Sequence, residues 1–145
     1  MNSLLMLRAS SGLWLFWGIV HVLFGVLIVR GDVSFAITAI ANGIESVASS
    51  YPDALGAIIN QHGWNLIWFG AVTIVAPIYI WRGNFGAAWM AATVGGLADL
   101  GYFLFLDLGG YVKFFPGTLM TIVALSAIVL TVGARFGRAT EVQRE

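Results

Sequence analysis

An all-α fold is predicted for the whole chain: a polytopic integral membrane protein with a single membrane domain, residues 1–145, formed by four transmembrane helices in a bundle. Composition is the first reason. The chain is 59% hydrophobic and 10% charged, whereas soluble domains average about 25% charged residues because their surface faces water. The second reason is that four separate stretches stay apolar for the roughly 20 residues that a helix needs to cross a hydrocarbon core about 30 Å thick.

The predicted spans cover about residues 11–29, 63–81, 86–106 and 115–134. Helices are expected because a helix satisfies its own backbone groups in lipid, and because these stretches lack the apolar–polar alternation of barrel strands. The first span is longer than the apolar core of a signal peptide, and no small-residue cleavage site follows it. Instead, Arg30, Gly31 and Asp32 come next. We therefore expect this span to be retained as a helix.

An outer amphipathic helical segment, residues 33–60, is predicted between the first and second spans. Apolar residues recur there at alternating spacings of four and three, which places them on one face of a helix. These residues are Val33, Ile37, Ile40, Ile44 and Val47. Pro52 is then expected to begin a short second helix. The segment is expected to lie over the outer ends of the spans, either as a lid or as a plain interfacial helix. Residues 135–145 are predicted to form a polar tail.

The basic residues predict the orientation, because cytoplasmic loops of membrane proteins carry an excess of Arg and Lys. With the N-terminus inside, five arginines are cytoplasmic: Arg8, Arg82, Arg135, Arg138 and Arg144. Only Arg30 and Lys113 are then outside. We expect a multi-pass protein whose N-terminus and C-terminus are both cytoplasmic.

His21 and Asp99 are polar residues deep inside predicted spans. At 1.5 Å per residue, His21 is about 15 Å into the first span and Asp99 roughly 20 Å into the third, so their levels in the membrane nearly match. An acid at the bilayer centre costs about 2.5–3.5 kcal/mol on insertion scales and usually faces the bundle interior with a partner. Both residues share helix faces with glycines, which allow close helix packing. A contact between His21 and Asp99 is therefore predicted.

The predicted ligand-binding site consists of residues placed near the level of Asp99. Its members are Asp99, His21, Tyr102, Asn65, Trp68 and Thr121. Asp99 and His21 are also the candidates for a catalytic acid and base, with Asp99 either neutral and donating a hydrogen bond or ionised together with His21. The alternative is that the pair only holds two helices together. No metal or cofactor is expected, because the chain has no cysteine and no recognised metal or reaction motif.

The function expected from these features is that of a small non-catalytic membrane protein. It would bind a hydrophobic ligand, or a larger membrane complex, through the polar site around Asp99 and His21. Its expected partners are the lipid bilayer, a hydrophobic small molecule or lipid, and a membrane protein or second copy of the chain. Nucleic acid is not expected, because the net charge is zero and the basic residues are scattered. Two alternatives stay open: a membrane enzyme acting on a lipid-like substrate, and a small proton-coupled transporter.

Overall fold

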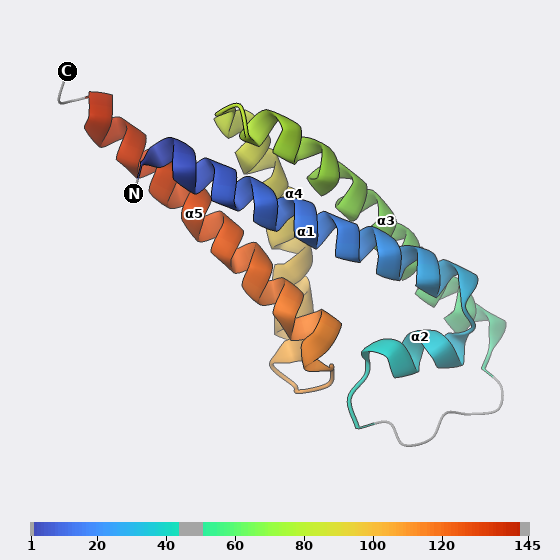
Figure 1. The fold of residues 1–145 in the computed structure, drawn as a ribbon. Helices are drawn as coiled ribbons and strands as arrows, with labels where there is room; N and C mark the ends of the chain where they lie inside the picture. The colour runs from blue at the N-terminus through green and yellow to red at the C-terminus, as the bar shows by residue number, and fades with distance from the viewer. Residues whose placement is uncertain (1, 44–50, 143–145) are drawn as a thin grey trace.

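The computed structural model describes residues 2–43 and 51–142, and every regular element in these two ranges is a helix (Figure 1). The elements in chain order are α1 (Ser3–Arg30), α2 (Val33–Ile40), α3 (Asp53–Ile80), α4 (Phe85–Tyr102), the π-helical turns η1 (Phe103–Asp107) and η2 (Phe114–Thr118), and α5 (Leu119–Val142). η1 continues α4, and η2 leads into α5. Four helical units, based on α1, α3, α4 and α5, are long and apolar enough to cross a membrane. The prediction of an all-helical chain with four such helices is confirmed.

The four long units form a bundle in which α1 lies between α3 and α5, while α4 crosses behind α1 (Figure 1). The start of α1, the end of α5 and the α3–α4 turn are at one end of the bundle, and α2 and the connection from η1 to η2 are at the opposite end (Figure 1). Asparagines begin two of the helices. The Asn2 side chain accepts from the backbone N–H of Leu4, and that of Asn84 accepts from Ala87, which satisfies N–H groups that have no partner within the helix.

The helices extend beyond the predicted spans. The predicted outer segment, 33–60, forms one helix only as far as Ile40, because Ala41 is extended (φ −73°, ψ 143°) and pairs in an antiparallel bridge with Val112. Ile44 and Val47 lie outside the described residues. The short helix expected after Pro52 is instead the beginning of α3, which runs unbroken to Ile80. The predicted polar tail is also helical, since α5 continues to Val142.

Close backbone contact between α1 and α3 explains why α3 continues through Gly63. A Cβ placed on Gly25 would lie 2.6 Å from the carbonyl oxygen of Gly63, and one on Gly63 would lie 3.0 Å from that of Gly25. The same holds for Gly18 and Gly70: a Cβ on Gly18 would lie 2.7 Å from the carbonyl oxygen of Gly70, and one on Gly70 would lie 2.6 Å from that of Gly18. A glycine costs an isolated helix about 1 kcal/mol relative to alanine, but here it allows two backbones to touch. Packing therefore outweighs the local helix propensity.

Buried polar contacts attach α1 to α5 and also to α3. Ser10 Oγ donates to the carbonyl of Ala127 at 3.0 Å and lies 2.9 Å from Thr131 Oγ1, both on α5. Ser11 Oγ donates to the carbonyl of Pro77 on α3 at 3.1 Å. Further along α1, Trp14 and Trp17 are fully buried. α1 is therefore the central helix, and residues directed from it toward α4 can meet Asp99.

Candidate functional site

Asp99 is a buried residue of α4 whose carboxyl group is held by α1. The indole N–H of Trp17 donates to Asp99 Oδ2 at 2.7 Å, and Asp99 is only 6% exposed. A hydrogen bond of this length to a carboxyl group is among the stronger kinds found in proteins. Asp99 was expected to have a partner on another helix. Its hydrogen-bond partner is Trp17, a residue that the predicted site does not include.

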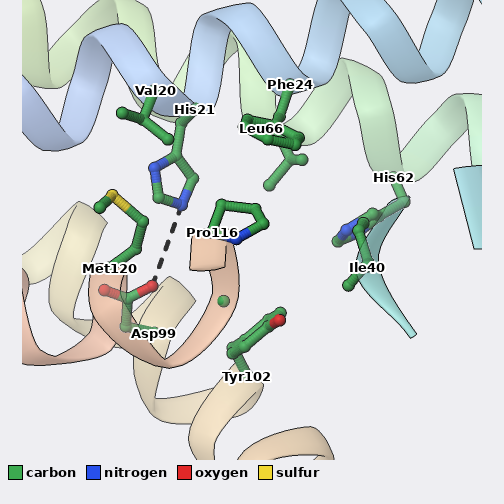
Figure 2. A pocket seen from close by; sticks show the side chains of 11 residues that line it. Val20, His21, Phe24, Ile40, His62, Leu66, Asp99, Tyr102, Pro116 and Met120 are labelled. Atoms are coloured by element: carbon green, nitrogen blue, oxygen red, sulfur yellow. Dashed lines mark ion pairs between the residues drawn. The ribbon is translucent and has the colours of Figure 1, made fainter. Parts of the chain in front are cut away.

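His21 is packed directly on Trp17, one helical turn away. The two rings stack with centroids 3.5 Å apart and an interplanar angle of 20°. His21 Nδ1 lies 2.8 Å from the backbone carbonyl oxygen of Trp17. The other ring nitrogen, Nε2, faces Asp99 and lies 4.0 Å from its Oδ1 (Figure 2). The structure therefore brings His21 and Asp99 together at ion-pair distance, beyond the usual 2.7–3.2 Å of a hydrogen bond.

A small cavity of about 50 Å³ lies beside this pair. Four of its lining residues are polar or ionisable: His21, His62, Asp99 and Tyr102. The rest of the lining is apolar or glycine: Val20, Phe24, Ile40, Leu66, Pro116, Gly117 and Met120. This volume exceeds what a single water molecule needs, so the cavity has room for a small polar group. It is a site for a small polar group within an apolar wall.

The Tyr102 hydroxyl is buried and has no hydrogen-bond partner among the residues that the structure describes. Its oxygen points away from Asp99, toward the side of the cavity where His62 and Ile40 lie (Figure 2). Gly117 packs against this hydroxyl so closely that a Cβ there would collide with it. A buried polar group without a partner costs about 1–3 kcal/mol. A ligand that hydrogen-bonds to Tyr102 would remove that cost.

The remaining predicted site residues do not line this cavity, although Thr121 lines a second hollow together with Asp99. Trp68 Nε1 donates to Asn65 Oδ1 at 3.2 Å on the surface of α3, and neither residue lines the cavity. Thr121 donates to Asp107 Oδ2 at 3.0 Å, and Thr118 donates to Oδ1 of the same carboxylate. The structure thus brings Asp99, His21 and Tyr102 to one cavity and places Asn65, Trp68 and Thr121 outside it.

A second hollow, an open apolar groove of about 540 Å³, lies between α4 and α5. Its lining includes small residues, among them Ala92, Gly96 and Ala124, together with larger apolar side chains and Thr121. Asp99 belongs to the lining of both the groove and the small cavity. Asp99 is therefore shared by the two hollows.

Trp17 is the site residue that the sequence analysis missed, although two signals point to it. It precedes His21 by four residues, so both project from the same side of α1. A buried indole N–H also needs an acceptor, and Asp99 is the only acidic residue within the predicted spans.

Within residues 2–43 and 51–142, no three His, Cys, Asp or Glu side chains are grouped so that they could hold a metal ion. Comparison of the chain with protein-family models, curated proteins and solved structures found no match.

Proposed function

We propose that this chain is a multi-pass membrane protein that binds a hydrophobic molecule by a small polar end group, in the cavity between His21 and Asp99, without transforming it. One observation carries the proposal. Three polar side chains, His21, Asp99 and Tyr102, face one cavity and leave hydrogen-bonding capacity unused. Small-molecule sites are typically apolar hollows with a few converging polar groups, and this cavity has that composition.

Insertion into a membrane is supported by the outer surface of the bundle. Large apolar side chains are exposed on the long helices, including Leu97 (65%), Leu125 (61%) and Val129 (61%). Soluble monomers rarely expose continuous apolar surface of this kind. In the proposed arrangement, these side chains face lipid acyl chains.

The proposed orientation has both termini in the cytoplasm. Arg8 belongs to the first part of α1, Arg82 to the α3–α4 turn and Arg135 to the second half of α5. These segments lie toward one end of the bundle (Figure 1), which favours that end as the cytoplasmic one. A membrane-impermeant thiol reagent tests the orientation in intact cells, since the chain has no cysteine of its own. Tyr111→Cys should be labelled without permeabilisation, and Glu145→Cys only after it. The reverse pattern would contradict the orientation.

A binding role is favoured over catalysis by the contact that the Asp99 carboxyl group already makes. One of its oxygens accepts from the Trp17 indole, so that oxygen is not free to act as an acid or base. An enzyme acting on a lipid-like substrate and a proton-coupled transporter are therefore secondary to binding.

The α2 segment is proposed to close the outer side of the site. Ile40, at the end of α2, lines the cavity. Directly after it, the backbone N–H of Asn42 donates to the carbonyl of Tyr111 at 2.8 Å, and that of Lys113 donates to the carbonyl of Ile40 at 2.9 Å. These bonds fasten the end of α2 to the connection between η1 and η2, which is the arrangement expected of a lid.

The test is direct binding by the full chain in lipid nanodiscs, with single-chain amphiphiles of equal tail length as probes: dodecanol, dodecanoic acid and dodecylamine. At least one probe should raise the unfolding temperature of the wild type. The same probe should raise the unfolding temperature of Tyr102→Phe or Asp99→Asn by a smaller amount. Tyr79→Phe is the matched control, because Tyr79 is exposed on α3 and does not line the cavity. Equal shifts for the wild type and both cavity variants, or no shift with any probe, would overturn the proposed binding.

A further inference from the structure

The hydrogen-bond partner of His21 fixes which ring nitrogen carries the proton. Nδ1 lies 2.8 Å from the backbone carbonyl oxygen of Trp17. A carbonyl oxygen only accepts hydrogen bonds, so Nδ1 is the donor. In the neutral imidazole, the other nitrogen, Nε2, then carries a lone pair and is an acceptor. Among the described residues no hydrogen bond is made to Nε2, which faces the cavity and Asp99.

Asp99 presents a second acceptor to the same space. Its Oδ2 receives the Trp17 indole N–H, while its Oδ1 faces His21 Nε2 across 4.0 Å. When Asp99 is ionised, its carboxylate only accepts hydrogen bonds, as does the neutral His21 at Nε2, so in that state the two facing atoms do not satisfy one another. A single donor atom at the ordinary distance of about 2.8–3.0 Å from each of them bridges this gap. The geometry therefore calls for a group with at least two hydrogens to donate.

Asp99 in its ionised form adds a second requirement. No Lys or Arg occurs within residues 9–29, 54–80, 86–106 or 114–134, and among the residues that the structure describes no Lys or Arg forms an ion pair with this acid. A buried charge is stable only when it is paired and hydrogen-bonded. A cationic group with two or more N–H donors would supply both the charge and the hydrogen bonds.

The geometry points to a lipophilic primary amine as the ligand, bound as its ammonium ion between His21 Nε2 and Asp99 Oδ1. This assignment rests on the proposed function, since it names the chemical class that the same cavity takes. A primary ammonium group has three N–H donors and is small enough for this cavity. The apolar chain of the ligand lies against Phe24, Ile40 and Leu66, the apolar part of the lining.

Related head groups meet these requirements less well. An alcohol donates one hydrogen, so it leaves either His21 Nε2 or Asp99 Oδ1 without a donor. A carboxylate brings a second negative charge beside Asp99, which disfavours binding. A trimethylammonium group carries the positive charge but has no N–H to donate, so it separates the effect of charge from that of hydrogen bonding.

The experiment compares four probes with the same dodecyl tail on the full chain in phosphatidylcholine nanodiscs, with empty nanodiscs subtracted. These are dodecylamine, dodecanol, dodecanoic acid and dodecyltrimethylammonium. Dodecylamine should bind the wild type about tenfold more tightly than any other probe, since one charge-assisted hydrogen bond is worth about that factor. Asp99→Asn should abolish the preference. An amide oxygen still accepts from Trp17, so this variant keeps the bond between α1 and α4.

Two further variants keep the test decisive. His21→Phe retains a ring stacked on Trp17 but removes the Nε2 acceptor, and it should weaken dodecylamine binding about tenfold. Asp107→Asn is the matched control, because Asp107 is a carboxylate on the same helical unit that accepts from Thr118 and Thr121 and does not line the cavity. It should leave the preference unchanged.

The outcomes distinguish the assignment of an amine ligand from the proposed binding function. If dodecanol, dodecanoic acid or dodecyltrimethylammonium binds as tightly as dodecylamine and the binding depends on Asp99, the amine assignment is wrong and the proposed binding function stands. If no probe distinguishes the wild type from Asp99→Asn and His21→Phe, both the assignment and the proposed function are wrong.

Discussion

The indole N–H of Trp17 donates to Oδ2 of Asp99 across 2.7 Å, and this hydrogen bond joins α1 to α4 at the buried acid. The same tryptophan accepts from His21 Nδ1 through its carbonyl and stacks against the imidazole through its ring. Trp17 therefore orients both side chains that face the cavity. Asp99 can lie in an apolar environment because the Trp17 indole on α1 donates a hydrogen bond to its carboxyl group.

Replacing Trp17 should destabilise the protein more than replacing an exposed tryptophan. Trp17→Phe keeps an aromatic ring but removes the donor to Asp99. Hydrogen bonds to charged groups contribute about 1.5–3 kcal/mol, and the free energy of unfolding in detergent should fall by about that amount. Trp89→Phe is the control, because Trp89 is 44% exposed. Equal stability of the two variants would show that the Trp17–Asp99 bond contributes nothing.

The glycine contacts between α1 and α3 predict a sharp difference between two substitutions in one helix. Gly18→Ala places a Cβ 2.7 Å from the carbonyl oxygen of Gly70, so the helices must separate, at a cost of about 1–3 kcal/mol. Gly12→Ala meets no atom within 4 Å and should be neutral or slightly stabilising because alanine favours a helix. Unfolding measurements on both variants check this. A Gly18→Ala variant as stable as Gly12→Ala would rule out the close contact.

Gly117 is predicted to keep the cavity open. A Cβ at this position would collide with the Tyr102 hydroxyl, so Gly117→Ala should displace that side chain into the cavity. Binding of dodecylamine should weaken about tenfold, which corresponds to about 1.4 kcal/mol, while the helical content measured by circular dichroism stays the same. Gly101→Ala, where a Cβ meets nothing within 4 Å, is the control. Unchanged affinity in Gly117→Ala would place the ligand elsewhere.

The lid role of α2 can be tested by locking it. Ala41 and Val112 form an antiparallel bridge, and the flanking backbone bonds make them a non-hydrogen-bonded pair, whose Cα atoms lie about 4.5 Å apart. That spacing suits a disulfide. In the double variant Ala41→Cys/Val112→Cys, dodecylamine should dissociate severalfold more slowly after oxidation than after reduction. Equal dissociation rates in the two states would leave α2 as an interfacial helix without a gating role.

The sequence was sufficient to predict the four long apolar helices and the approach of His21 to Asp99. Span length and composition follow from the thickness of a hydrocarbon core, and the depth of a residue along a helix follows from its position. These quantities are local, so no knowledge of the helix order was needed. The spacing of His21 from the glycines of the first span also predicts that His21 lies on the helix face that packs inside the bundle.

Packing between helices decides what the sequence does not reveal. Depth alone puts Asn65 and Trp68 near the level of Asp99, but neither residue lines the small cavity. The break expected before Gly63 does not occur, because Gly63 contacts the backbone of α1. Trp17 was overlooked as the partner of Asp99, since tryptophan in a span is more often a packing or interface residue. Only the rotation of the helices relative to one another reveals these relationships.

The most direct test of the account is the indole N–H resonance of Trp17 in an NMR titration with dodecylamine, assigned through Trp17→Phe. Because this N–H donates to the carboxyl group proposed to bind the ammonium ion, its resonance should shift on saturation in the wild type and in Asp107→Asn. It should not shift in Asp99→Asn, and the other tryptophan indoles should shift less. Binding that leaves the Trp17 resonance unmoved, or moves it equally in Asp99→Asn, would contradict a ligand site at His21 and Asp99.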